Sequence, residues 1–138
     1  MKERLRFVNF KLDRLPSGEC RARVTLAWPE GAKFEGEARG LTSQAGELRC
    51  AAQATLHALA QAVREPNFEL VGVKSVRAFD ATVVIVSLGL PGGSEGPRVV
   101  GSYLTELDVP RGAALAVLNA TNRMLARQDG PGRQASQL

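Results

Sequence analysis

The sequence predicts an α+β protein built from two tandem βββα repeats related by a pseudo-two-fold axis, each a three-stranded antiparallel sheet followed by one helix. Three observations lead to this prediction. Short segments of alternating apolar and polar residues occur in two groups of three. Each group precedes one long segment with helical periodicity. Turns rich in proline and glycine separate most neighbouring strand segments.

The first repeat begins with predicted strands over residues 5–12, 19–28 and about 32–41. In the middle strand, alternate residues share one apolar face: Cys20, Ala22, Val24, Leu26 and Trp28. Turns at Pro16-Ser17-Gly18 and Pro29-Glu30-Gly31 separate the three strands. In the second turn, proline presets φ and glycine accepts the left-handed conformation that closes a hairpin.

Residues from about 44 to 64 change to helical periodicity. Their apolar stripe has the spacing of one helix face: Leu48, Ala52, Thr55, Leu56, Leu59, Ala62 and Val63. Ser43 is a suitable N-cap because its hydroxyl can accept a hydrogen bond from a free N–H of the first turn. Pro66 cannot continue a helix, so we expect it to end this one.

The second repeat follows the same order. Residues 68–79, 81–90 and 98–107 are predicted strands, with a long loop rich in glycine and proline before the last of them. Asp108 is suited to cap the second helix, and Pro110 is tolerated in its first turn. The apolar stripe of this helix consists of Ala114, Val117, Leu118, Thr121, Met124 and Leu125.

The two repeats correspond in sequence, which indicates an internal duplication. Adding 62 to each of the last six stripe positions of the first helix gives the stripe of the second, so that Leu56 corresponds to Leu118. The strand segment at 34–38 likewise matches that at 99–103. One helix covers the apolar face of a three-stranded sheet only in part. We therefore expect the units to pack on each other, and on a second chain as a homodimer.

Length and composition set the domain organisation. We expect residues 1–127 to form a single domain of two units, about 5–64 and 68–127, because 138 residues leave little room for a second domain. Residues 128–138 have no periodicity and are expected to form a disordered tail. Hydrophobic residues make up 44% and charged residues 23%, as in globular proteins.

The composition also excludes several classes. No apolar run approaches the roughly 18 residues of a membrane span, and the basic N-terminal residues lead into an alternating segment rather than the apolar stretch typical of a signal peptide. We expect a cytoplasmic protein in which Cys20 and Cys50 are reduced thiols. One histidine and two cysteines do not make up a structural zinc site, and we expect no metal or other cofactor.

The net charge of +4 is concentrated in residues 1–23. This segment carries three acidic residues and seven basic ones. The basic residues are Lys2, Arg4, Arg6, Lys11, Arg14, Arg21 and Arg23. A basic strand can contact nucleic acid, which makes a nucleic-acid-associated protein the alternative function. A solvated strand face accounts for the same charges, and no aromatic platform is interleaved with them.

The two strand-to-helix junctions, at residues 36–43 and 101–108, are candidates for a binding site. Their small residues would let a ligand approach the backbone, and the free N–H groups of a helix start attract a carboxylate. Asp108 or Glu106 could hold an ammonium group. Two such junctions would form a pocket for an amino acid or an α-keto acid. Equally, the glycines could mark bulges and Asp108 could serve only as a cap.

Four segments of the second repeat resemble the C-terminal regulatory domain of 2-isopropylmalate synthase and citramalate synthase. They are 80–86, 99–102, 108–109 and 113–125, and the last ends in Leu118-Asn119-Ala120-Thr121-Asn122-Arg123-Met124-Leu125. That domain has two βββα units, dimerises, and binds the end-product amino acid, leucine or isoleucine. The resemblance covers about residues 19–127. It implies a stand-alone form of this domain with ligand contacts at Gly36, Gly40, Gly101 and Asp108.

We therefore expect a non-catalytic protein that binds an amino-acid-like effector or modulates a partner enzyme. An enzyme would instead need a titrating group in a cleft. His57, the only histidine, is the candidate, on the flank of the first helix stripe. The sequence defines neither a nucleophile nor an orienting carboxylate beside it.

Overall fold

Two three-stranded antiparallel sheets, each followed by one helix, make up the chain, as predicted. The computed structural model describes residues 4–64, 67–90 and 98–128, and for residues 125–128 it describes the backbone alone. The first unit contains β1 (Arg6–Arg14), β2 (Glu19–Ala27), β3 (Lys33–Leu41) and α1 (Gln44–Ala62). The second contains β4 (Glu69–Ala78), β5 (Ala81–Gly89), β6 (Arg98–Thr105) and α2 (Val109–Gln128).

The ends of the elements differ from the predictions by a few residues. The helix α2 includes Gln128, although the sequence predicts a disordered tail from residue 128. Alanine, arginine and glutamine at 126–128 are all favourable helix formers, which explains the extension. The helix α1 ends at Ala62, where the Val63 N–H donates to the Leu59 carbonyl. Pro66, the loop at 91–97 and residues 129–138 lie outside the described residues.

The two sheets share one strand order and one register, which extends the duplication to three dimensions. The central strands are β2 and β5, and in each sheet the first and third strands flank the second. Val24 lies opposite Gly36 in the first sheet, and Val86 lies opposite Gly101 in the second. The first strand of each sheet has a bulge at the corresponding position. It lies between Phe7 and Asn9 in β1 and between residues 70 and 72 in β4.

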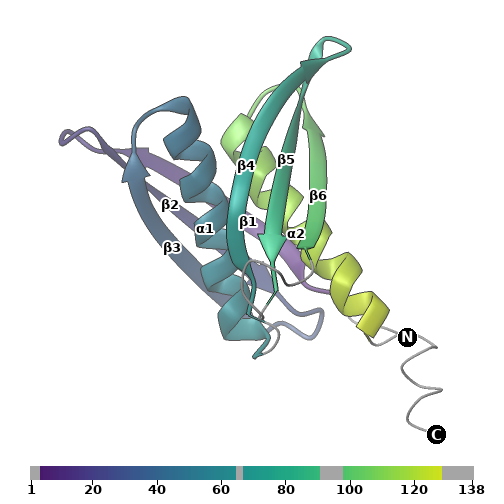
Figure 1. Ribbon diagram of the computed structural model, residues 1–138. Coiled ribbons are helices and arrows are strands. Elements are labelled where there is room, and N and C mark those ends of the chain that lie inside the picture. Colours follow the sequence, from purple (N-terminus) through teal and green to yellow (C-terminus); the bar gives the residue numbers. More distant parts are fainter. Residues whose placement is uncertain (1–3, 65–66, 91–97, 129–138) are drawn as a thin grey trace, which may run out of the picture.

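The helices pack between the two sheets (Figure 1). Each helix lies on its own sheet, the helices contact each other, α1 also contacts β4, and α2 also contacts β1. One continuous core therefore contains buried residues of both units, including Val24 and Leu56 from the first and Val86 and Val117 from the second. In the part of the chain that is described, neither helix is long and apolar enough to cross a bilayer.

Candidate functional site

A cavity of about 880 Å³ lies where the first turns of both helices meet β1. Figure 1 shows α1 and α2 beginning at the same end of the molecule. The wall of this cavity combines residues of β1 with residues of both strand-to-helix junctions: Phe10, Lys11, Leu12, Arg14, Thr42, Ser43, Gln44, Glu47, Leu48, Leu107, Asp108, Val109 and Pro110. The structure thus brings together the ends of the two junctions that the sequence singled out.

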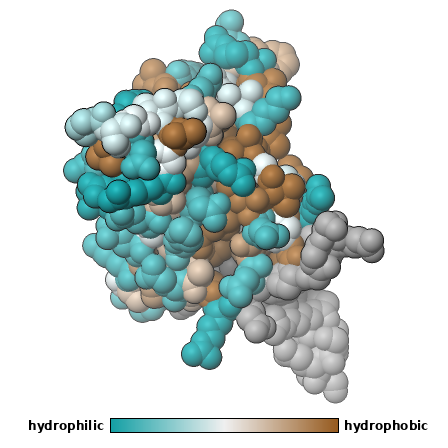
Figure 2. Space-filling model, turned by 60° about the vertical axis from the view of Figure 1, so that its left-hand side comes forward, coloured by the Kyte–Doolittle hydropathy of each residue, from teal (hydrophilic) through white to brown (hydrophobic). Residues whose placement is uncertain are grey.

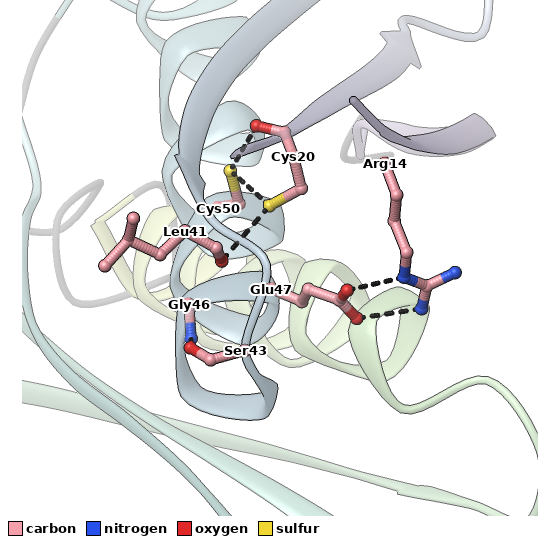
Figure 3. Close-up of polar contacts among 7 residues, drawn as sticks. All are labelled: Arg14, Cys20, Leu41, Ser43, Gly46, Glu47 and Cys50. Carbon is pink, nitrogen blue, oxygen red and sulfur yellow. Dashed lines mark hydrogen bonds and ion pairs between the residues drawn. The ribbon is translucent and has the colours of Figure 1, made fainter. Parts of the chain in front are cut away.

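Both helix starts at this cavity are capped by the predicted residues. The Ser43 hydroxyl accepts a hydrogen bond of 3.0 Å from the Gly46 N–H (Figure 3). The Asp108 carboxylate accepts one of 3.1 Å from the Arg111 N–H through Oδ1. Each cap satisfies one N–H and leaves the partial positive charge of the helix N-terminus directed at the cavity. Asp108 is exposed, so its second oxygen can also receive a cation from the cavity.

An ion pair between Arg14 and Glu47 forms part of the same wall. The Arg14 Nε and Nη2 atoms donate to the two carboxylate oxygens of Glu47 at 2.7 and 3.0 Å (Figure 3). The Glu47 side chain is only 10% exposed, whereas that of Arg14 is 63% exposed. Its hydrogen bond to Glu47, followed by the attraction between the two charges, raises the pKa of Arg14 above its ordinary value. Arg14 therefore stays charged at the edge of the cavity.

Sequence reasoning missed this pair, although a signal for it exists. The sequence places Arg14 among the basic residues of a solvated strand face. In β1 it lies opposite Cys20, on the same face as Leu12 opposite Ala22, which is the face that packs on α1. A charged residue in phase with an inward apolar stripe indicates a buried partner. The alternation alone does not say that the partner is in the first turn of α1.

A second cavity, of about 540 Å³, lies at the end of β3 beside the first turns of α1. Its lining includes Arg39, Gly40, Arg49, Cys50 and Gln53. Gly40 therefore lines this second cavity. None of the charged residues that line the larger cavity is among the lining residues of this one.

The two thiols lie side by side next to this second cavity, and Cys50 is part of its lining. Cys20 Sγ and Cys50 Sγ are 3.5 Å apart and both residues are buried and unoxidised (Figure 3). Cys50 Sγ donates to the Ala38 carbonyl at 3.4 Å. Burial, followed by the hydrogen bond with Cys20, raises the pKa of Cys50 to about 12. A thiol that stays protonated at neutral pH is a poor nucleophile, so Cys50 serves packing between α1 and the first sheet.

The four predicted ligand contacts do not gather in one place. Asp108 lines the larger cavity and Gly40 the smaller. Gly36 and Gly101 face the helices, where an added Cβ would collide with backbone atoms of Ala54 in α1 and of Ala116 in α2. This close approach of strand to helix accounts for both glycines without a ligand.

The basic residues of the alternative function are also spread out. Lys2 lies outside the described residues, and Arg14 faces inward to Glu47. Arg21 and Arg23 both lie near the Asp13 carboxylate, at 3.5 and 3.6 Å. Arg4, Arg6 and Lys11 are exposed. Because acidic partners lie among these residues, the described part of the segment does not present an unbroken basic surface.

His57 supports the edge of the first sheet. Its Nδ1 lies 2.6 Å from the Glu37 carbonyl of β3, and because a carbonyl can only accept, Nδ1 carries the proton. Asn119 occupies the corresponding position in α2, and its amide donates to the Ser102 carbonyl of β6 at 3.0 Å. The recurrence of this bond in both units assigns His57 to strand-to-helix contact.

No protein-family model matches the chain, and a search of curated proteins found no match either. The likeness to the synthase regulatory domain therefore stays a prediction. In the part of the chain that is described, no three histidine, cysteine, aspartate or glutamate side chains lie close enough to hold a metal ion.

Proposed function

We propose that this protein is a non-catalytic regulator that binds a small amino-acid-like effector in the cavity between the two helix starts. The observation that supports this is the convergence of opposite charges on one cavity. Arg14 supplies a cation, and Glu47 and Asp108 supply carboxylates. Such a distribution complements a zwitterion.

Each end of an amino acid has a counterpart in the cavity wall. A carboxylate is favoured near the exposed Arg14 guanidinium and near the partial positive charge of the two helix N-termini. An ammonium group is favoured near Asp108, because Glu47 is already paired with Arg14. Phe10, Leu48 and other apolar residues of the wall can contact an aliphatic side chain. The cavity volume of about 880 Å³ is ample for a ligand of this size.

The position of the cavity suits a regulatory role. Its wall contains residues of α1 from the first unit and of α2 from the second. A ligand held by both helix starts would stabilise one arrangement of the two units. A partner enzyme or a second copy of the chain could respond to that change, in line with the expected regulatory and dimerising function.

The test is a thermal-shift screen of the twenty amino acids and common 2-keto acids, followed by calorimetric titration of any stabilising compound. A ligand at 100 times its dissociation constant should stabilise the fold by about 2.7 kcal/mol. Arg14→Gln and Asp108→Asn should each weaken binding about tenfold, since each removes one charged contact. Asp108→Asn keeps an oxygen for the cap.

The matched control is Lys33→Gln, which removes an exposed lysine from β3, outside the wall of the cavity. Its affinity should equal that of the wild type. If no compound in the panel shifts the melting temperature, the effector proposal fails. Equal losses in Lys33→Gln and Arg14→Gln would show that the ligand binds elsewhere.

A further inference from the structure

The two sheets have the same topology but opposite chemistry on the faces directed away from the helices. On the first sheet this outer face is largely charged: Lys11, Asp13, Arg21, Arg23, Glu35, Glu37 and Arg39. On the second sheet the corresponding face carries six large apolar side chains: Val71, Val76, Val83, Ile85, Val100 and Leu104. Its polar residues are fewer and include Lys74, Ser87 and Ser102, with Glu69 and Arg98 at one end. Figure 2 shows a band of hydrophobic residues beside a broadly hydrophilic surface.

This apolar face is exposed in the isolated chain. Five of the large hydrophobic side chains that are more than a third exposed lie on it: Val71, Val76, Ile85, Val100 and Leu104. Folding of a βββα unit does not require such a face, since the first unit carries charges there. Monomeric proteins rarely expose a contiguous apolar area of this kind. The difference between the duplicated halves therefore indicates a surface that is covered in the assembled protein.

We propose that a second copy of this chain covers it, with the two β4–β5–β6 sheets packed face to face about a two-fold axis that runs along β5. Such an axis places β4 of one copy over β6 of the other. The outer residues of the two strands then become partners, and each contact occurs twice. Sheets packed face to face lie about 10 Å apart with strand directions within about 30° of each other, and side chains from the two faces interdigitate.

Residues that pair across β4, β5 and β6 form rows that run across the sheet. Under this axis each row packs on the same row of the partner, and the side chains at its two ends fit each other. Val76 and Leu104 flank Val83 in one row, so the rotation sets Val76 over the partner's Leu104. In another row Gly72 and Val100 flank Ser87. Val100 then lies over the partner's Gly72, above which the space is open.

Charge is complementary as well, and this selects a second copy over an unrelated apolar partner. Glu69 of β4 and Arg98 of β6 flank Gly89 at the end of the sheet, and both are exposed. The same rotation brings each Glu69 to the partner's Arg98. Lys74, in the row of Ile85, comes to the partner's Ser102, whose hydroxyl can accept a hydrogen bond.

The interface lies on the side of the second sheet that faces away from α2, and its residues are not among those of the effector cavity. This inference therefore does not rest on effector binding. It names the face and symmetry of the homodimer that the sequence only anticipates.

The test measures the mass of the full chain in solution by sedimentation velocity over a concentration series. We expect a species of twice the chain mass. Ile85→Glu, at the centre of the face, and Val100→Glu should each weaken dimerisation about 30-fold or more. Val8→Glu is the matched control, because Val8 is 45% exposed in the bulge of β1 and Val100 is 52% exposed. The control should remain dimeric, and circular dichroism should show all variants folded.

A charge reversal tests the symmetry itself. Glu69→Arg and Arg98→Glu should each weaken the dimer, because each places like charges opposite one another. The double reversal should restore it to within a few-fold of wild type. A monomer at all concentrations overturns the proposal and points to another macromolecule as occupant. So does a dimer that Ile85→Glu leaves intact or that the double reversal does not restore.

Discussion

Arg14 and Cys50 show how neighbouring groups change what a side chain does. Arg14 belongs to a basic segment, yet its guanidinium is engaged by a nearly buried glutamate. Cys50 is one of two free thiols, yet burial keeps it protonated. Residue type alone suggests that Arg14 contacts nucleic acid. The surroundings, which involve residues 30 or more positions away, change that interpretation.

The raised pKa of Cys50 predicts a loss of stability at high pH. The unfolded thiol ionises near the ordinary value of 9.0, whereas the folded one ionises near 12. Between these values the unfolded state has released a proton that the native state still holds, so rising pH favours unfolding. The free energy of unfolding should fall by up to about 1.4 kcal/mol per pH unit above pH 9 from this thiol alone.

Urea unfolding under reducing conditions from pH 7 to pH 11 measures this effect, with Cys50→Ala as the reference. The alanine variant loses packing at every pH, but it lacks the titrating thiol. The two stability curves should run parallel up to about pH 8 and converge above pH 9. Parallel curves throughout would contradict the assignment.

At the scale of elements, two glycines set the distance between each third strand and its helix. Gly36 lies against Ala54 and Ala58 of α1, and Gly101 against Ala116 and Ala120 of α2. The alanines correspond in the two helices, 62 residues apart, just as the glycines correspond in the two strands. Small residues on both sides of each contact let helix and strand approach closely.

Gly36→Ala should therefore destabilise the protein by about 1–3 kcal/mol, because the new methyl group overlaps backbone atoms that cannot rotate away. Gly89→Ala is the control, since its Cβ would lie at ordinary contact distances, 3.4 Å from Val71 Cγ2 and 3.9 Å from the Glu69 carbonyl oxygen. The control should change stability by a few tenths of a kcal/mol. Chemical denaturation of both variants measures the difference, and equal effects would refute the packing role of Gly36.

At the scale of the molecule, contacts between the halves make one core. The buried side chain of Asn122 in α2 donates to the Leu5 carbonyl, at 3.1 Å, and so ties the start of the chain to the last helix. The Arg111 guanidinium lies 4.9 Å from the centre of the Phe7 ring. These contacts join parts of the sequence that are more than 100 residues apart.

Asn122→Ala should lower the free energy of unfolding by about 1–3 kcal/mol, because it leaves the Leu5 carbonyl buried without a donor. Asn119→Ala is the control: that amide is exposed and bonds within the second unit, so its loss should cost less. Unfolding should remain a single transition by both circular dichroism and the fluorescence of Trp28, the only tryptophan. Separate midpoints would show that the halves unfold independently.

The sequence by itself determined the elements and their repetition. Alternation around Val24 and helical spacing around Leu56 depend on neighbours a few residues away, so local periodicity reveals them. Ser43 and Asp108 were identified as caps for the same reason, since a cap bonds three residues ahead.

Only the tertiary structure decided which of these elements meet. It brought the two helix starts to one cavity, turned Arg14 toward Glu47, and placed Gly36 against α1, away from that cavity. It also showed that Ile85 lies on an open face. Packing between distant segments sets these positions. Because the hydrophobic effect is not directional, the sequence pattern shows which residues are buried but not which residues they pack against.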